Sequence, residues 1–426
     1  MQNRRSGLAF LAATIFLIAN SRDAAGLPIP PSEWRPWAPR EEIAPRTYVD
    51  TIQCRRPDGA LVISGASNSA AFGGWEHKVS DVSAGKWYRF TAWYRTEGVP
   101  FESRQVVARL DWSARDGKRI GWPDLAWRVS GEGPWKRMSL DAPAPRGASS
   151  VKLQLYLLNA PQGAVWWDDI SFDSIEAPPA RPVSVAAVNL RPSGSKSAEE
   201  NLRRFADLVG SAVPSGTDMV LLPEGITVVG NGRTYVEVAE PIPGPATSRL
   251  GDLARAKKSW IVAGVYERDG QAVYNTAVLI DRTGRVTGKY RKVYLPREET
   301  EAGLTPGEGH PVFETDFGRV GMMICWDLQF PGPAQAMALQ GAEVLLMPIW
   351  GGSEVLGRAR AIENRVFLVS SGYDYPAQIV DPSGEILATT TAQGTVALST
   401  IDLNRRYEER WLGEVRGRFM KEVRRP

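Results

Sequence analysis

Three chemically useful side chains lie at the ends of predicted strands. Glu224 follows the apolar run at 219–222, and Cys325 follows the apolar run at 320–324. Lys292 lies near the end of 274–296, which has the pattern of two strands joined by a tight turn. A thiol, a carboxylate and an ammonium group can supply the nucleophile, the base and the electrophile of an acyl-transfer reaction. Such a site needs no histidine.

Each of these residues also has a plain structural interpretation. A glutamate after a strand is commonly a solvated surface group, and a buried cysteine is commonly a small hydrophobe. Lys289 and Arg291 compete with Lys292 for the cationic role. Period-two alternation puts Lys292 on a different face from Arg291, and Lys289 lies nearer the turn, so Lys292 ranks first. A nearby lysine and a helix N-terminus would lower the pKa of the thiol.

The scarce residues exclude several other kinds of site. The chain has only two histidines, His77 and His310, and two cysteines, Cys54 and Cys325. A structural zinc site needs about four such ligands, and a disulfide scaffold needs more cysteines. The chain has neither a G-x-S-x-G elbow nor a G-x-x-x-x-G-K-[ST] phosphate loop. We expect no metal and no cofactor, and we expect both cysteines to be unpaired.

The N-terminus predicts export. Residues 1–26 combine Arg4 and Arg5 with an apolar run at 8–19, which is shorter than the ~20 residues of a membrane-spanning helix. We expect a cleaved signal peptide and a periplasmic or extracellular protein, or a membrane-tethered one if the signal is retained. The formal net charge is only +3, so no nucleic acid partner is expected.

Composition divides the rest of the chain in two. Eleven of the fifteen tryptophans precede residue 179, and a proline-rich linker occupies 175–182. We therefore expect one domain at 27–178 and a second at 179–403. The charged tail at 404–426 would either contact a partner subunit in a homodimer or form a solvated helix on its own domain.

Residues 27–178 have the alternation of β-strands. The clearest runs are 87–95 and 151–158, and similar ones occur at 61–68, 74–82, 103–114, 135–142 and 164–172. About seven short strands at this spacing predict an antiparallel sandwich. SAGKWYRFTAWYRTEG and GAVWWDDISF resemble segments of jelly-roll modules that bind carbohydrate, which implies a glycan partner. The alternative is that most of the tryptophans pack in the core.

The second domain alternates short apolar runs with helical patterns. The run at 183–190 precedes helical spacing at 197–213. Further apolar runs follow at 219–225 and 260–267, with a helical stretch at 245–258 between them. This order predicts an α/β layer domain.

The same domain resembles the nitrilase, or carbon–nitrogen hydrolase, superfamily. The resemblance covers 183–403 in order and implies an α-β-β-α sandwich. The segments that carry it are LLPEG at 221–225, GKYRKVYLP at 288–296, GRVGMMICWDLQF at 318–330 and RAIENRVFLVSSG at 360–372.

The resemblance implies a role for each residue of the site. Cys325 would attack the substrate carbon and Glu224 would act as general base. Lys292 would hold the oxyanion together with the backbone N–H of Trp326. Many relatives carry a second glutamate after the lysine, and Glu299 is chosen here over Glu298 and Glu301.

The residues after the cysteine bear on the reaction. Cys325-Trp326-Asp327 followed by Phe330-Pro331 resembles the amidases and N-carbamoyl amine hydrolases, whereas true nitrilases usually have Trp-Glu. The expected substrate is a small amide or ureido compound, in a pocket lined by Trp350 and Gly351. Where the family usually has Pro-Glu, this chain has Pro331-Gly332. The resemblance therefore does not predict how the following helix starts.

Three alternatives remain at this point. A nitrilase would convert a nitrile to an acid, and ammonia release from nitriles and amides separates the two. The acyltransferase branch has several membrane spans, which are missing from this sequence. The third alternative is a carbohydrate-binding adhesion protein with an inactive hydrolase domain, and the presence of all three catalytic residue types argues against it.

Overall fold

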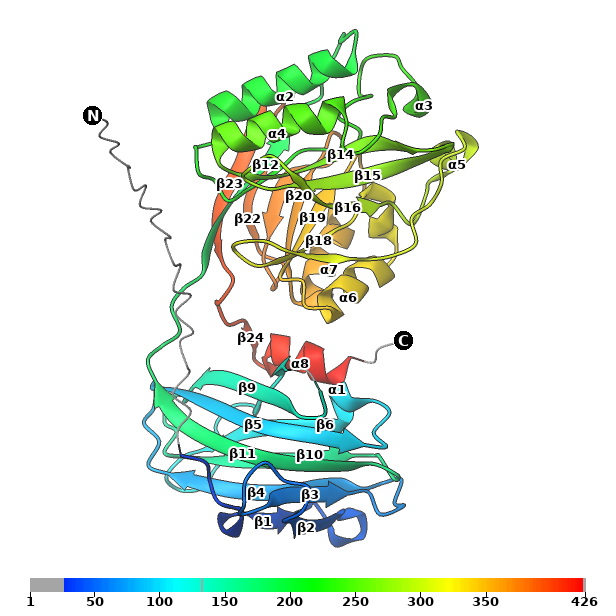
Figure 1. The fold of residues 1–426 in the computed structure, drawn as a ribbon. Coiled ribbons are helices and arrows are strands. Elements are labelled where there is room, and N and C mark those ends of the chain that lie inside the picture. Colours follow the sequence, from blue (N-terminus) through cyan, green and yellow to red (C-terminus); the bar gives the residue numbers. More distant parts are fainter. Residues whose placement is uncertain (1–26, 132, 424–426) are drawn as a thin grey trace, which may run out of the picture.

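The computed structural model describes residues 27–131 and 133–423, so the predicted signal segment lies outside the described residues. The chain forms two domains, one above the other in Figure 1, joined by the linker after Ile175 and by a returning C-terminal segment. None of the helices in these ranges has the length and apolar character that crossing a bilayer requires.

The N-terminal domain consists of two antiparallel sheets. The first sheet has the order β1-β4-β10-β6-β7, and the second has the order β2-β3-β11-β5-β9-β8. Their strands are β1 (Arg35–Trp37), β2 (Arg46–Asp50), β3 (Ala60–Ser64), β4 (Phe72–Ser80), β5 (Trp87–Glu97), β6 (Val106–Ser113), β7 (Asp124–Leu125), β8 (Arg128–Ser130), β9 (Lys136–Pro143), β10 (Ser150–Leu158) and β11 (Ala164–Ile175). Short helical turns are η1 (Pro31–Glu33), η2 (Glu41–Ile43) and α1 (Glu102–Gln105).

The core of this domain lies between the two sheets. The side chains that alternation placed on one face of β5 and β10 are buried there, with Phe90 at 1% and Leu153 at 0% exposure. Trp112 and Trp167 are fully buried, so packing accounts for them. The predicted strand at 103–114 begins only at Val106, because α1 precedes it. The strands missed by sequence reasoning, β1, β2, β7 and β8, have two to five residues, too few for a periodic pattern.

The C-terminal domain contains two six-stranded sheets with the orders β16-β15-β14-β13-β12-β23 and β17-β18-β19-β20-β21-β22. The strands are β12 (Pro182–Asn189), β13 (Met219–Leu221), β14 (Trp260–Asp269), β15 (Ala272–Ile280), β16 (Val286–Arg291), β17 (Val312–Glu314), β18 (Arg319–Met322), β19 (Val344–Pro348), β20 (Phe367–Ser371), β21 (Ala377–Val380), β22 (Ile386–Thr390) and β23 (Thr395–Asp402). The helices are α2 (Ala198–Ala212), α3 (Tyr235–Val238), α4 (Pro245–Lys257), α5 (Arg297–Glu301), η3 (Cys325–Gln329), α6 (Gly332–Leu339) and α7 (Glu354–Asn364).

The two sheets pack face to face with helices outside them. One apolar cluster joins the inner faces, where Val185 and Leu221 of one sheet meet Met322 and Leu346 of the other. Helices α2 and α4 cover the outer face of the first sheet, and α6 and α7 cover that of the second (Figure 1). The domain is therefore the four-layer α-β-β-α sandwich that the sequence resemblance implied.

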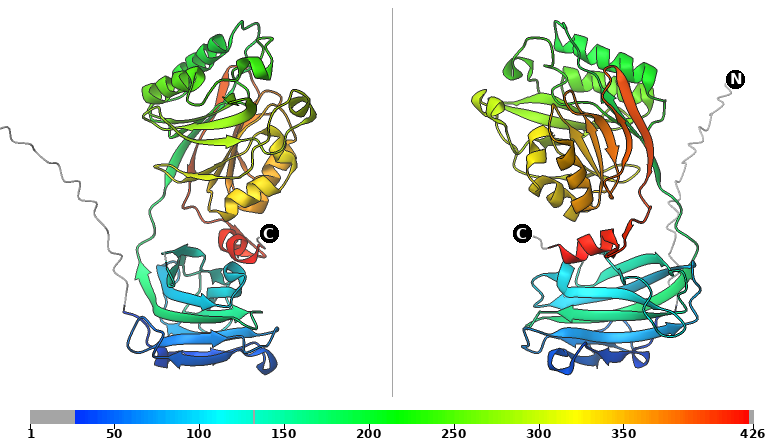
Figure 2. Two further views of the ribbon diagram at one scale, coloured as in Figure 1. Left: turned by 45° about the vertical axis from the view of Figure 1, so that its right-hand side comes forward. Right: turned by 180° about the vertical axis from the view of Figure 1, so that it is seen from behind.

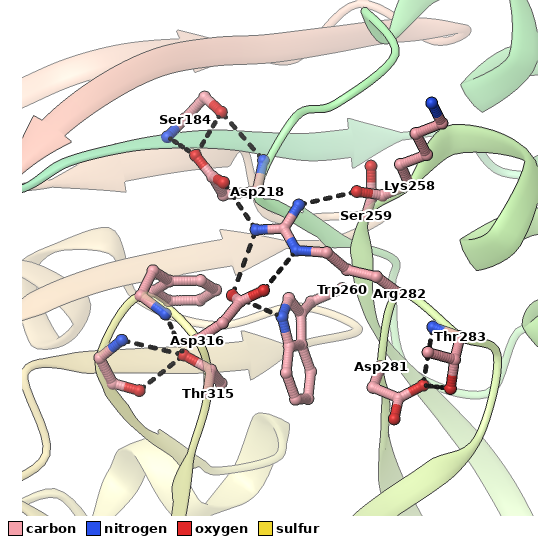
Figure 3. A network of polar contacts seen from close by, with 12 residues as sticks. Ser184, Asp218, Lys258, Ser259, Trp260, Asp281, Arg282, Thr283, Thr315 and Asp316 are labelled. Carbon is pink, nitrogen blue, oxygen red and sulfur yellow. Dashed lines mark hydrogen bonds and ion pairs between the residues drawn. The ribbon is translucent and has the colours of Figure 1, made fainter. Parts of the chain in front are cut away.

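Arg282 links the two sheets through Asp218 and Asp316 (Figure 3). Its guanidinium donates to Asp218 and to Asp316, both at 2.7 Å, and to the carbonyl of Lys258 at 2.7 Å. Asp316 also accepts from the indole of Trp260 at 2.9 Å. Because Asp218 precedes β13 and Asp316 follows β17, one side chain ties both layers together.

The C-terminal segment returns to the N-terminal domain. After β23, the short strands β24 (Glu408–Glu409) and β25 (Gly413–Glu414) lead into α8 (Val415–Glu422), which lies between the two domains in both views of Figure 2. Lys421 donates to the carbonyl of Val106 at 3.0 Å, and Arg416 donates to the carbonyls of Ala342 and Asn364 at 3.0 Å. The tail therefore packs between the domains rather than forming a solvated helix, and a contact with a second subunit remains a prediction.

Candidate active site

The three sequence-predicted residues follow three different strands. Glu224 comes three residues after β13, Lys292 directly follows β16, and Cys325 lies three residues after β18. The strands β13 and β18 belong to different sheets, so the site forms where the carboxyl ends of the two packed sheets meet.

Glu224, Lys292 and Glu299 form a closed polar cluster. The Nζ of Lys292 lies 2.9 Å from Oε1 of Glu224 and 3.1 Å from Oε1 of Glu299. The three residues are only 1–3% exposed. The amide nitrogen of Asn275 donates to both carboxylates, at 2.7 Å to Glu224 and 2.6 Å to Glu299. One ammonium and one amide thus hold two carboxylates together away from water.

Burial and charge shift the pKa values in this cluster. Burial alone would lower the pKa of Lys292, but the negative charges of Glu224 and Glu299 outweigh it, and the pKa is raised well above the usual value. Lys292 is therefore a permanent cation. Burial raises the pKa of Glu299 to about 7, with Lys292 opposing this shift and the charge of Glu224 adding to it.

Cys325 occupies a strained position at the start of η3. Its φ is +42°, in the left-handed region that non-glycine residues rarely adopt. The Sγ atom donates to the carbonyl of Gly351 at 3.7 Å. Burial, aided by the charge of Glu224 and opposed by that of Lys292, raises the pKa of the thiol to about 12. Lys292 lowers the pKa of the thiol, as the sequence led us to expect, but burial and the charge of Glu224 outweigh its effect.

Asp327 connects the cysteine turn to the lysine segment. Its Oδ2 accepts from the hydroxyl of Tyr290 at 2.8 Å and from the backbone N–H of Ile324 at 2.9 Å. Its Oδ1 accepts from the backbone N–H of Tyr294 at 3.0 Å. Because Tyr290 and Tyr294 flank Lys292 on either side, this one carboxylate fixes the lysine segment against the turn that carries Cys325.

The competing residues lie elsewhere. Lys289 and Arg291 both pair with Glu267 and do not join the cluster. Glu301 pairs with Arg297 at 2.7 Å in an exposed position. Glu298 is exposed as well. Among the three loop glutamates, only Glu299 contacts Lys292.

Trp350 and Gly351 lie beside the cysteine turn. The ring of Trp350 packs edge-on against Tyr373 at 4.9 Å between centroids, and the Tyr373 hydroxyl donates to the backbone carbonyl of Glu224 at 2.9 Å. Trp350 lines a cavity of about 670 Å³. Gly351 accepts the hydrogen bond from Cys325 but does not line this cavity. Arg191 lies over the Trp350 ring at 5.9 Å and pairs with Asp374 at the edge of the cavity.

The residues after Cys325 complete the turn. Trp326 is 41% exposed, so its indole is not part of the buried cluster. Helix α6 begins at Gly332 without the glutamate that the family usually has there.

Sequence reasoning missed three residues of the site. Asn275 lies within a family-like segment, YNTAVLIDRTG, but an asparagine in a strand carries no signal of its own. The roles of Asp327 and Tyr373 depend on contacts between strands far apart in the chain. The segment Cys325-Trp326-Asp327 was the one available hint for Asp327.

Comparison with known proteins decides the family. The model of the family described as "Carbon-nitrogen hydrolase" matches residues 184–410, more than half of the chain. The chain belongs to the carbon–nitrogen hydrolase family. Its C-terminal domain therefore is a hydrolase domain acting on carbon–nitrogen bonds other than peptide bonds.

Named relatives of this hydrolase include omega-amidases and a nitrilase. Omega-amidase NIT2 of Bos taurus is 31% identical over 256 residues, covering 53% of this chain and 91% of the relative. A nitrilase of Pyrococcus abyssi is 34% identical over 239 residues, covering 52% and 90%. The solved structure of Nit3 of Saccharomyces cerevisiae has a TM-score of 0.47 at 26% identity, covering 52% and 90%.

Proposed function

We propose that this carbon–nitrogen hydrolase is an exported amidase that cleaves small amides or ureido compounds through a Cys325 acyl-enzyme. The observation that carries this proposal is the shielded contact of Lys292 with Glu224 and Glu299 next to the strained cysteine turn. A permanent cation, a carboxylate with a free oxygen and a nucleophile are the parts that acyl transfer to a thiol requires.

The first half-reaction forms the thioester. Oε2 of Glu224 is buried and, within the described residues, has no hydrogen-bond partner, so it is free to take the thiol proton. The sulfur then attacks the carbonyl carbon, and Lys292 with the backbone N–H of Trp326 stabilises the oxyanion. When the tetrahedral intermediate collapses, the C–N bond breaks and protonated Glu224 returns its proton to the leaving nitrogen, which departs as ammonia or an amine.

The second half-reaction releases the acid. Glu224, again ionised, takes a proton from water, and the resulting hydroxide attacks the thioester carbon. Lys292 again stabilises the oxyanion. The C–S bond breaks, the carboxylic acid leaves, and the thiol regains its proton, so no other reactant is needed.

The raised thiol pKa gives Glu224 a definite task. A neutral thiol near pKa 12 is a weak nucleophile at neutral pH, so proton removal must accompany attack on the bound substrate. Substrate entering the site displaces the remaining water, which strengthens the interactions of Lys292 with the developing oxyanion. This coupling protects the cysteine from side reactions when no substrate is bound.

The relatives favour amide substrates. Several are named omega-amidases, and one is named a nitrilase. The residues Cys325-Trp326-Asp327 also follow the amidase pattern rather than the usual nitrilase one. Export rests on the signal-like residues 1–26, and detection of a mature chain lacking these residues in the periplasm or medium tests it.

A substrate screen tests the reaction. The full chain is incubated with small aliphatic amides, dicarboxylic acid monoamides, ureido acids and the matching nitriles, and ammonia is measured. We expect release from at least one amide or ureido compound. Release from nitriles alone would replace the amidase by a nitrilase, and release from none would contradict both.

A further inference from the structure

A large cleft separates the two domains at the end of the hydrolase domain away from Cys325. Its volume is about 1800 Å³, which exceeds the ~300–1,000 Å³ of ordinary small-molecule pockets. One wall is the outer face of β5 and β9, including Trp87 and Ser139. The other wall includes Arg319 and Phe367, the first residues of β18 and β20.

The lining of this cleft is strongly basic. Twelve of its residues are arginine or lysine and five are aspartate or glutamate. Several of these charges neutralise each other, as in the pairs of Arg89 with Asp141 and Arg181 with Glu343. Others pair with carboxylates just outside the lining, as Arg406 does with Asp124. The remaining charge is therefore concentrated on a few side chains.

Besides Arg416, whose guanidinium donates to backbone carbonyls, three arginines of the cleft have no carboxylate partner among the described residues. Arg104 lies over the ring of Phe101 at 4.5 Å, Arg128 over its neighbour Trp127 at 5.0 Å, and Arg405 over Tyr407 at 5.0 Å. Stacking on a ring orients a guanidinium group and leaves its in-plane N–H groups free for an oxyanion.

The three arginines come from both domains. Arg104 and Arg128 belong to the sandwich, and Arg405 belongs to the segment that follows β23. The indole of Trp87 is only partly buried in the same cleft, whereas Arg128 and Arg416 lie over the ring of Trp127 at 5.0 and 5.8 Å. The cleft thus combines fork-shaped donors for carboxylates with a flat apolar ring, which can stack on the C–H face of a sugar ring.

We propose that the interdomain cleft binds a linear acidic glycan, with carboxylates on Arg128 and Arg405 and a sugar ring against the partly exposed indole of Trp87. The five carboxylates of the lining favour a ligand with spaced charges over a polymer with a phosphate at every residue. The size of the cleft favours an oligomer over a monosaccharide. The expected export would place the protein among such polymers.

This binding would be separate from the hydrolysis of amides. Arg319 at the cleft and Cys325 are six residues apart in mostly extended chain, roughly 20 Å. The cleft lies at the amino ends of β18 and β20, and the catalytic turn follows the carboxyl end of β18. The glycan would therefore hold the enzyme on a surface without entering its active site.

Titration calorimetry of the full chain with oligogalacturonate tests the proposal. The fully methyl-esterified oligomer keeps the sugar rings and removes the charge. We expect binding to the acidic form, and at least about tenfold weaker binding to the ester. We expect a similar loss for Arg128→Ala/Arg405→Ala and a smaller one for Arg128→Lys/Arg405→Lys, which keep the charge but not the planar fork. Thermal melting checks that each variant is folded.

The matched control is Arg203→Ala/Arg249→Ala, which removes two arginines from α2 and α4 at the far end of the hydrolase domain. We expect unchanged glycan binding in this control and unchanged amide hydrolysis in every variant. Failure to bind, equal binding of the ester, or equal loss in the control would overturn the proposal. Tighter binding of a single-stranded oligonucleotide through the same arginines would overturn it too, in favour of a phosphate polymer.

Discussion

The Nζ of Lys292 lies 2.9 Å from Oε1 of Glu224, and neither residue is more than 2% exposed. Buried charges of this kind are stable only when they are paired and hydrogen-bonded. The pair leaves Oε2 of Glu224 without a partner among the described residues. The ion pair therefore fixes the ammonium group and leaves the other carboxylate oxygen free, as the proposed oxyanion-binding and base roles require.

The protonation state of Cys325 predicts slow and strongly pH-dependent alkylation. Because the pKa of the thiol is raised to about 12, the thiolate fraction should rise about tenfold per pH unit throughout the accessible range. The rate of iodoacetamide modification, measured by mass spectrometry of the Cys325 peptide in a Cys54→Ser background, should show no plateau between pH 6 and 10. A plateau near pH 8 to 9 would indicate an ordinary thiol and contradict the burial argument.

The raised pKa of Glu299 predicts that its contribution to stability depends on pH. Its pKa is raised from 4.5 to about 7 in the folded protein, so the folded state binds more protons between these values. Its contribution to stability is therefore present below pH 4.5 and is lost as the pH rises through 7, by up to ~3 kcal/mol. The melting temperature of Glu299→Gln minus that of the wild type should increase from pH 5 to pH 8. A difference that is constant with pH would contradict the raised pKa.

The two hydrogen bonds of Asn275 predict that it positions Glu224 and Glu299. Asn275→Leu keeps the side chain's approximate size but removes the amide that bridges Glu224 and Glu299. Losing hydrogen bonds to charged groups should lower kcat/KM by about 10- to 100-fold. Because one favourable contact of the ionised Glu299 disappears, its transition in the pH–rate profile should also move above 7.

Thr276→Val is the matched control for Asn275→Leu. Thr276 is the residue after Asn275 in β15. The substitution removes its buried hydrogen bond to Glu267, which lies outside the cluster of Glu224, Lys292 and Glu299. We expect wild-type kcat/KM and an unchanged pH–rate profile. If both variants lose activity equally, the loss in Asn275→Leu comes from a general disturbance of β15, and the positioning role of Asn275 is contradicted.

The three hydrogen bonds of Asp327 predict that it couples the cysteine turn to the lysine segment. Asp327→Asn replaces an acceptor oxygen by a donor in a site where all three partners are donors. We expect a loss of ~2–4 kcal/mol in the free energy of unfolding and a lower kcat. Tyr290→Phe removes only one of the three bonds and should cost about 1 kcal/mol. Equal effects of the two substitutions in denaturant titrations would argue against this role.

Much of the fold followed from patterns within single segments. The alternation in β5 and β10 correctly separated core from outer side chains, and the helical spacing at 197–213 corresponds to α2, which Ser197 caps by accepting from Glu200 N–H. The carbon–nitrogen hydrolase domain was predicted from motifs in order along the chain. Such signals are local, so no tertiary information was needed to read them.

The remaining features depend on contacts between distant segments. The 3.1 Å contact with Lys292, which favours Glu299 over its neighbours, is visible only in the structure. The raised pKa of Cys325 follows from burial, which a strand-to-helix pattern does not specify. The position of α8 between the domains depends on Arg416 and Lys421 finding backbone carbonyls in both.

The most direct test compares ammonia release by Cys325→Ala and Cys54→Ala on an amide that the wild-type protein hydrolyses. Both variants remove one thiol, but only Cys325 lies in the turn that we propose to be catalytic. We predict wild-type release from Cys54→Ala and no release above background from Cys325→Ala. Ammonia release by Cys325→Ala at the wild-type rate would contradict the thioester mechanism.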